Sequence, residues 1–469
     1  MIKLLTALVT LSFLASAQAQ DFNPQELRSR TIERRAVEAL VWGMPAVNYD
    51  LMLQEALKKT SVRQNEIVYW SRPVDWKNQT LTPNPDALYF MIFFNTKEAG
   101  PIVIDVPPAD GGSFAANIDT VWQMPLEDAG PYGADQGKGG KYLILPPGYR
   151  EKPPDGYIAV QSQTFAGYAL FRSNLVSHAD ADVAKAETYG KRLKVYPLSQ
   201  AATPQETKFT DAKEVLYDST IPYDLRFFQS LDRIVQSEPW LTRDKAMIDP
   251  LKSIGIEKGK AFTPDAETTE ILNRAAVEAR AFLDRNYEIG FPPFFPTTRW
   301  AVPAFSDLVK AGSSGYAEAD IYPVDARALT YSIGYIGIKR LGTAQTYLIT
   351  SKDEDGAQLE GDKSYRLHVP PNVPVELYWS VTAYDRETHA LIKNLDRASR
   401  ASNAAELQKN TDGSVDIWFG PKAPAGKEVN WVPTDPQRGF ELLFRLYGPK
   451  KELFEKLWVL PDVEKVAVQ

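Results

Sequence analysis

The 469-residue chain contains no cysteine. Disulfides, zinc–thiolate sites, iron–sulfur clusters and thiol nucleophiles are therefore excluded. Histidine is scarce as well: His178, His368 and His389 stand far apart, and neither an H-E-x-x-H motif nor a close histidine pair occurs. The sequence therefore predicts no tightly bound transition metal and no cofactor. Calcium stays open, because it needs only oxygen ligands.

Several catalytic and binding signatures are also missing. The chain has no G-x-S-x-G nucleophile elbow and no G-x-G-x-x-G dinucleotide loop. The stretch GIEKGK at 255–260 is one residue short of a phosphate loop, and no Ser or Thr follows its lysine. The net charge is −7 and no long basic stripe interrupts it. This charge pattern argues against a nucleic-acid partner.

Long apolar runs are absent after the first twenty residues, so we expect a protein that does not span a membrane. The one apolar run, residues 4–15, follows Lys3 and precedes the small-x-small sequence Ala17-Gln18-Ala19. This pattern is typical of a secretory signal peptide that is cleaved near Ala19. We therefore expect a bacterial export signal and a mature protein in the periplasm or outside the cell.

What the sequence has in quantity is proline (34), tyrosine (22) and tryptophan (10), which suits many short strands closed by turns. The clearest strand is SFAANIDTVWQ at 113–123, where Phe114 and Ile118 point one way and Asn117 and Asp119 the other. Similar strands recur near the end of the chain, in VELYWSVTAYD and GFELLFRLYGPK. Strands at such spacing indicate sandwiches or barrels.

Helical patterns occupy the beginning and the middle of the chain. Apolar residues in 36–44 follow helical spacing, and Pro45 is expected to kink or end that helix, with a second piece over 49–59. Residues 180–197 and 323–342 read as further helices, ended by Pro197 and Gly342.

The expected fold is mainly β with α: two β-sandwich or jelly-roll-like domains separated by a helical segment. We predict a signal peptide at 1–19, N-terminal helices at 20–60, a first β-sandwich at 61–175, a helical segment at 176–342 and a jelly-roll-like domain at 343–469.

The stretch TPNPDALYF at 82–90 is the first candidate site. Pro83 and Pro85 fix their own φ, and Pro85 also pushes Asn84 towards an extended backbone. Asn84 and Asp86 then have two interpretations. They build a strand-entry turn, or they face a ligand from a rigid loop.

On the second interpretation, these side chains lie at the rim of the first sandwich, near Asn117 and Asp119, and line a polar pocket that faces the second domain. Tyr384 or Arg386 would close that pocket. The predicted ligand-binding residues are Asn84, Asn117, Trp122, Tyr384 and Arg386.

Structural roles compete with this interpretation. Asn117 and Asp119 could lie on a solvent-exposed strand face, and Trp122 could fill a core. Arg445 stands inside an apolar strand, so it needs a partner. That partner could be a structural carboxylate such as Asp385 or Asp416.

The chain resembles a known family at TPNPDALYF, YWSVTAYD, NTDGSVDIWFG, NWVP and FRLYGPK. It is similar to secreted bacterial proteins that carry, in this order, domain of unknown function 1254 and domain of unknown function 1214. The resemblance covers about residues 35–463. It implies a β-sandwich first domain, a helical segment and a jelly-roll-like second domain, often within a homo-oligomer. It implies almost nothing about activity and supplies no catalytic residues.

Three functions remain open. The first is an exported, soluble protein that binds a small molecule or glycan in a cleft between the two β-domains. The second is a carboxylate-dependent hydrolase of glycans or amides, with Asp86 and Asp119 as the catalytic pair, which requires carboxyl groups about 5–9.5 Å apart. The third is a structural envelope protein. A pocket with paired carboxylates favours the second, an aromatic pocket without such a pair the first, and a flat surface the third.

Overall fold

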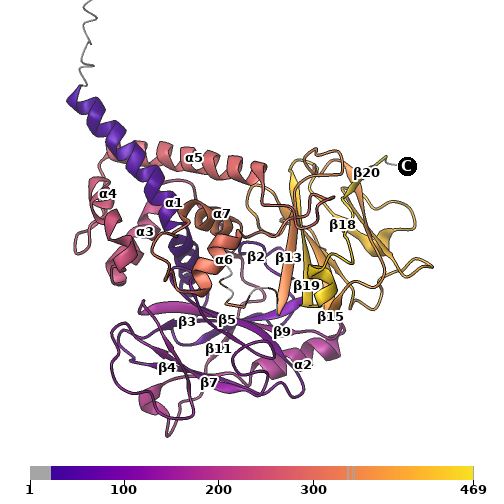
Figure 1. Ribbon diagram of the computed structural model, residues 1–469, viewed down its shortest axis with the longest axis horizontal. Helices are drawn as coiled ribbons and strands as arrows, with labels where there is room; N and C mark the ends of the chain where they lie inside the picture. Colours follow the sequence, from indigo (N-terminus) through magenta and orange to yellow (C-terminus); the bar gives the residue numbers. More distant parts are fainter. Residues whose placement is uncertain (1–22, 335–336, 338, 341, 343, 468–469) are drawn as a thin grey trace, which may run out of the picture.

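The computed structural model describes residues 23–334, 337, 339–340, 342 and 344–467. The predicted signal peptide at 1–19 lies outside the described residues and stays a prediction. Strands gather in two regions, one formed early and one late in the chain, and helices lie between and above them (Figure 1). Within the described part of the chain, no helix has the length and apolar character needed to cross a bilayer.

The first β-region consists of two facing sheets, with strand orders β11-β1-β3-β9-β5-β6 and β10-β4-β7-β8, and a short pair β12-β2. Alternate side chains such as Phe90 and Ile104 fill the space between the two sheets. The strands are β1 (Ile67–Tyr69), β2 (Asn78–Gln79), β3 (Ala87–Asn95), β4 (Ile102–Val106), β5 (Phe114–Thr120), β6 (Pro125–Ala129), β7 (Gly140–Leu145), β8 (Ile158–Gln161), β9 (Ala166–Asn174), β10 (Lys194–Pro197), β11 (Phe209–Asp211) and β12 (Tyr217–Asp218).

The second β-region is a sandwich of the sheets β13-β19-β15-β16 and β18-β17-β14-β20. Trp379 and Phe444 of one sheet share a core with Leu367 and Ile417 of the other. The predicted fold class, mainly β with α and two sandwich-like regions, is confirmed. The strands are β13 (Gln345–Thr350), β14 (Ser364–Val369), β15 (Val375–Asp385), β16 (Ser399–Ala401), β17 (Val415–Gly420), β18 (Trp431–Pro433), β19 (Phe440–Pro449) and β20 (Glu464–Val466).

Most of the helices lie over the outer face of the large sheet of the first region, whereas α2 packs into the core between its two sheets and α8 belongs to the second region (Figure 1). Met91 and Phe93 of β3 pack there against helical residues such as Met44 and Leu231. The helices are α1 (Pro24–Lys59), α2 (Asp180–Gly190), α3 (Leu225–Ser237), α4 (Ile248–Ser253), α5 (Ala266–Ile289), α6 (Ser306–Ser313), α7 (Val324–Ile333) and α8 (Lys451–Phe454).

Three helix predictions were wrong in their extent. α1 continues through Pro45 because the local cost of an internal proline, about 3 kcal/mol, is outweighed by the complete burial of its neighbours. The predicted helix at 180–197 ends at Gly190, and its last four residues form β10, which extends the first region by pairing with β4. α7 ends at Ile333 with Gly334 as its C-cap, well before Gly342.

The two central strands of the second region bury both faces. On β15 and β19, one set of alternate residues, including Trp379 and Phe444, points into the sandwich core. The other set includes Tyr378, Arg445 and Tyr447, each at most 1% exposed. These side chains pack against the first region, which explains why the two strands read as nearly continuous apolar runs.

Candidate functional site

The loop between β2 and β3 is fixed by its own side chains before it meets the second region. Thr82 holds a left-handed backbone (φ 41°), which a β-branched residue rarely adopts. Asn84 Oδ1 accepts a hydrogen bond from the backbone N–H of Asp86 (3.0 Å), and the N–H of Asn84 donates to Tyr89 OH (2.6 Å). Asn84 thus closes a tight turn and still has its amide nitrogen free to reach outwards.

That amide nitrogen contacts two tyrosines of the second region. Asn84 Nδ2 donates to Tyr378 OH (3.1 Å) and to Tyr447 OH (2.9 Å). The two phenol rings stack with their centroids 4.5 Å apart. Burial raises the pKa of Tyr378 and of Tyr447 well above the ordinary value. Both are therefore neutral phenols, and the contact is uncharged.

Arg445 binds the same loop through its backbone. Its Nη2 donates to the carbonyl of Thr82 (2.8 Å) and to Tyr384 OH (2.5 Å), and Tyr384 OH donates to the carbonyl of Pro83 (2.5 Å). Its Nη1 donates to Thr382 Oγ1 (2.9 Å). The guanidinium is thus held by carbonyl and hydroxyl oxygens.

The expectation that a structural carboxylate pairs with Arg445 was therefore wrong. Asp385 pairs with Arg438, and Asp416 lies 2.8 Å from His368. The loop carbonyls and phenol oxygens take the place of a counter-ion, because a buried guanidinium needs hydrogen-bond acceptors and these need not carry charge.

Residues from three of the sequence motifs thus meet in one place. We call Asn84, Tyr378, Tyr384, Arg445 and Tyr447 the interface cluster. Each is at most 1% exposed. The cluster joins the two β-regions by hydrogen bonds, so the positions of nearby hollows are fixed by it.

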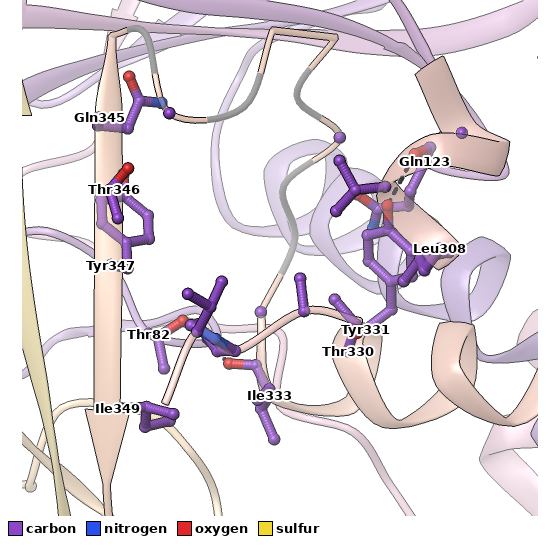
Figure 2. Close-up of a pocket in the computed structure, with 18 of the residues that line it drawn as sticks. Thr82, Gln123, Leu308, Thr330, Tyr331, Ile333, Gln345, Thr346, Tyr347 and Ile349 are labelled. Carbon is purple, nitrogen blue, oxygen red and sulfur yellow. Dashed lines mark hydrogen bonds between the residues drawn. The ribbon is translucent and has the colours of Figure 1, made fainter. Parts of the chain in front are cut away.

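A cavity of about 210 Å³ lies on one side of the interface cluster. Figure 2 shows Gln345, Thr346 and Tyr347 of β13 on one side of it and Gln123 and Tyr331 on the other. The lining is mainly apolar. Among the described residues it includes Pro125, Phe294, Val302, Pro303, Ala304, Leu308, Ile333, Ile349, Leu443 and Phe454.

Polar groups without partners stand in this apolar wall. Gln345 is 2% exposed, and neither Nε2 nor Oε1 of its side chain has a hydrogen-bond partner. The hydroxyls of Thr346 and Thr330 also lack partners. By contrast, the carbonyl of Gln123 accepts a hydrogen bond from Tyr331 OH (2.9 Å). Because a buried polar atom without a partner costs about 1–3 kcal/mol, these groups need an explanation.

Thr82 and Asp86 lie at the two ends of the loop, and each of them lines a different hollow. Thr82 lines the apolar cavity, and its Oγ1 donates to the carbonyl of Ile333 (2.9 Å). Asp86 lines a second hollow of about 320 Å³ against residues 392–406 of the second region. Its Oδ1 accepts from Ser399 Oγ (3.0 Å) and lies 3.4 Å from His178 Nε2.

Asn117 and Asp119 lie elsewhere, on the helix-facing side of β5, and line neither hollow. Asn117 accepts from Arg172 (2.9 Å) and donates to Asp128 (2.9 Å). The solvent-exposed alternative was wrong, because the two side chains are 4% and 0% exposed.

The predicted carboxylate pair is contradicted by the strand register. Ala87, next to Asp86, pairs with Asn174 of β9, whereas Asp119 pairs with Tyr168. Six residues of β9 separate these positions, which is about 20 Å at a rise of about 3.3 Å per residue. Asp86 and Asp119 are thus too far apart to act on one bond.

Asp119 is nevertheless unusual. It is fully buried, and neither carboxyl oxygen has a hydrogen-bond partner. Burial, followed by the nearby Asp128, raises the pKa of Asp119 well above its ordinary value. We therefore expect a neutral carboxyl group beneath the helices.

Trp122 and Arg386 also lie away from the loop. Trp122 packs against Trp42, with ring centroids 4.7 Å apart, inside the helix-covered core. Arg386 lies over the ring of Tyr287 (3.9 Å) and donates to Glu288 (3.0 Å). Of the predicted ligand-binding residues, the structure therefore brings together Asn84 and Tyr384.

Sequence reasoning missed Gln345 and Arg400, which line the apolar cavity and the second hollow. Neither residue belongs to a motif with a recognisable spacing. The only sequence feature that could have indicated Gln345 and Arg400 is a polar residue beside an apolar strand. In the described part of the chain, no cluster of three or more His, Asp or Glu residues is placed to hold a metal ion.

Comparisons with known proteins agree with this architecture. Residues 64–197 match the family model described as protein of unknown function (DUF1254), and residues 344–451 match the one described as protein of unknown function (DUF1214). None of the curated proteins matches the chain.

Two solved structures are similar. The crystal structure of the VPA0106 protein from Vibrio parahaemolyticus shares 18% sequence identity and a TM-score of 0.57, with 93% of this chain and 100% of that chain covered. An uncharacterized protein from Burkholderia cenocepacia shares 12% identity and a TM-score of 0.44, covering 95% and 96%. The first of these supports the fold.

The two matched segments coincide with the two β-regions that the interface cluster joins. The chain therefore belongs to the proteins that combine an N-terminal DUF1254 domain with a C-terminal DUF1214 domain.

Proposed function

We propose that the protein binds a small, mainly apolar molecule in the cavity between its two β-regions, and that the molecule carries one hydrogen-bonding group of the amide type. The observation that carries this proposal is the buried, unpartnered side-chain amide of Gln345 in an otherwise apolar wall. Ligand sites typically combine apolar walls with a few polar groups that fix orientation.

The size of the cavity limits the ligand. An engineered apolar cavity of about 150 Å³ holds benzene. This cavity, at about 210 Å³, has room for a ring with a short substituent. The terminal torsion of a glutamine is soft, so the amide can turn towards an entering group. The Nε2 donor group and the Oε1 acceptor of Gln345 match the carbonyl and the N–H of a carboxamide or a lactam.

The interface cluster supports a preformed site. Thr82 lines the cavity and is held by Arg445 through its backbone carbonyl. Tyr347, another lining residue, lies under the guanidinium of Arg445 at 5.3 Å from the ring centroid. A wall that is already ordered reduces the entropy cost of binding.

A thermal-shift titration tests the proposal with a matched pair of probes, benzamide and ethylbenzene. Benzamide should raise the melting temperature of the wild type more than ethylbenzene, because only benzamide supplies partners for Gln345. In Gln345→Met the advantage of benzamide should vanish. Gln437→Met, at an exposed position, is the control and should respond as the wild type.

Equal shifts with both probes, or an advantage of benzamide that persists in Gln345→Met, would contradict the proposal.

Export is part of the proposal, because residues 1–19 carry the features of a signal peptide. The N-terminus of the recovered protein should begin at or near Gln20, and intact Met1 would refute this.

A further inference from the structure

The hollow on the other side of the loop differs in chemistry from the apolar cavity. It measures about 320 Å³ and lies between residues 73–76, Pro85, Asp86 and His178 of the first region and residues 392–406 of the second. We call it the polar cleft. Because both β-regions contribute walls, a ligand here would contact both.

Asp86 lines this cleft, and one of its two carboxyl oxygens has no hydrogen-bond partner. Its Oδ1 accepts from Ser399 Oγ (3.0 Å), and His178 Nε2 stands 3.4 Å away without forming a hydrogen bond. Its Oδ2 has no partner, although the side chain is 0% exposed. A buried carboxylate oxygen of this kind calls for a donor.

Arg400 lines the same cleft, and part of its guanidinium has no hydrogen-bond partner. Its side chain is 7% exposed, and its one ion pair joins Nη1 to Glu406 at 3.5 Å. Nε and Nη2 have no hydrogen-bond partner. Burial, followed by the neighbouring Arg397, lowers the pKa of Arg400 to about 10. Two adjacent arginines in partly dry surroundings favour an anionic ligand.

The remaining charged groups of the cleft leave the pairing of Arg400 and Asp86 incomplete. Arg397 donates to the backbone carbonyls of Glu428 (2.8 Å) and Trp431 (2.9 Å). Asp75 is paired with Arg72 (3.1 Å). Asp396 and Glu406 are exposed to solvent. The inner wall therefore presents an incompletely paired guanidinium and an incompletely paired carboxylate.

From this arrangement we infer that the polar cleft binds a small hydroxylated carboxylate of the size of a sugar acid. The ligand carboxylate lies at Arg400 and Arg397, and a ligand hydroxyl donates to Asp86 Oδ2. Trp76, which also lines the cleft, supplies an apolar wall for the ring. Sulfate or chloride fits less well, because neither anion offers Asp86 a donor and its charge would be repelled by the carboxylate.

This inference does not depend on the proposed function of the apolar cavity. No residue of the cleft used here lines that cavity. The two ligand classes also differ, since one is neutral and mainly apolar and the other is charged and hydroxylated.

Isothermal titration of the mature protein with three matched probes tests the inference. Glucuronate carries the carboxylate and the hydroxyls, glucose the hydroxyls alone, and cyclohexanecarboxylate the carboxylate alone. Glucuronate should bind at least tenfold more tightly than either analogue at matched ionic strength. Arg400→Met and Asp86→Asn should each reduce glucuronate affinity at least tenfold. Arg192→Met, at an exposed ion pair, is the control.

The melting temperature without ligand separates binding from a structural role. A binding arginine with incomplete pairing should be replaceable, so Arg400→Met should melt no lower than the wild type. A fall of several degrees in Arg400→Met with glucuronate affinity unchanged would overturn the inference. It would also be overturned by equal affinities for the three probes, or by the absence of saturable glucuronate binding.

Discussion

The apolar cavity and the polar cleft lie at opposite ends of one short loop, and they differ in which elements form the wall opposite that loop. At the Thr82 end, α6, α7 and β13 supply apolar side chains and the neutral amide of Gln345. At the Asp86 end, residues 392–406 supply Arg397 and Arg400.

The loop is common to both hollows, so the walls opposite decide the chemistry of each. A single rigid segment, held by the interface cluster, thus borders two hollows of unrelated chemistry. This comparison predicts that a substitution in the interface cluster changes ligand responses at both hollows. A substitution in the wall of one hollow should change the response at that hollow alone.

The largest expected effect comes from Arg445→Met, which removes the side chain that holds the loop common to both hollows. The substitution leaves the carbonyls of Thr82 and Pro83 without the guanidinium donor. We expect a loss of about 2–5 kcal/mol in the free energy of unfolding. Responses to benzamide and glucuronate should fall together.

Chemical denaturation of Arg274→Met provides the control, because that arginine is half exposed and its ion pairs contribute less than about 1 kcal/mol. If Arg445→Met lowers one ligand response and leaves the other intact, the two hollows do not share the cluster as a common support.

The next effect concerns Asp119, which lies behind the cavity and is not part of the cleft. Its pKa is raised in the folded state, so the unfolded chain releases this proton first, near pH 3.9. Above that pH, and up to the folded pKa, the free energy of unfolding falls as pH rises.

Asp119→Asn cannot titrate and should escape this loss. At pH 7 the variant should be more stable than the wild type by about 1.4 kcal/mol for each pH unit below 7 by which the folded pKa exceeds the unfolded pKa. At pH 3 the difference should disappear. Denaturant unfolding across this range measures it, and a variant that is less stable at every pH would show that Asp119 is paired and charged.

A smaller effect is expected from Gly312→Ala in α6, which alters the cavity alone. The nearest heavy atom to the added Cβ would be Pro125 Cδ at 3.7 Å, an ordinary contact. Because alanine favours a helix over glycine by about 1 kcal/mol, the melting temperature should rise slightly. Benzamide binding should weaken, and glucuronate binding should not change.

Gly315→Ala is the matched control nearby, since Gly315 has φ +67° and an added side chain would be strained there. It should lower the melting temperature. A change in glucuronate affinity in Gly312→Ala would break the distinction between the two hollows.

Much of the fold could be predicted from local patterns. Alternation in 113–123 located β5, and the apolar runs located β15 and β19. The ends of the helices were harder to predict, because they depend on packing and strand pairing with residues that are distant in the sequence. Pro45 remains inside α1, and Lys194–Pro197 leaves the helical pattern to pair with β4.

The candidate site could be predicted only in part. Two prolines indicated that Asn84 is held rigidly, which requires nothing beyond local geometry. Its partners Tyr378 and Tyr447 lie 294 and 363 residues away, and no local pattern reports such contacts. Gln345 and Arg400 escaped notice for a related reason: what distinguishes them is a missing partner, which becomes visible only in three dimensions.

The most direct test of the central claim is a ¹⁵N–¹H NMR titration that observes the side-chain amide of Gln345, assigned by its absence in Gln345→Met. Benzamide should shift this pair of resonances in a saturable manner, and ethylbenzene should shift them far less, because only benzamide can hydrogen-bond to the amide. If the Gln345 resonances do not respond to benzamide while the protein stays folded, the cavity does not bind its ligand through this residue, and the proposed function is wrong.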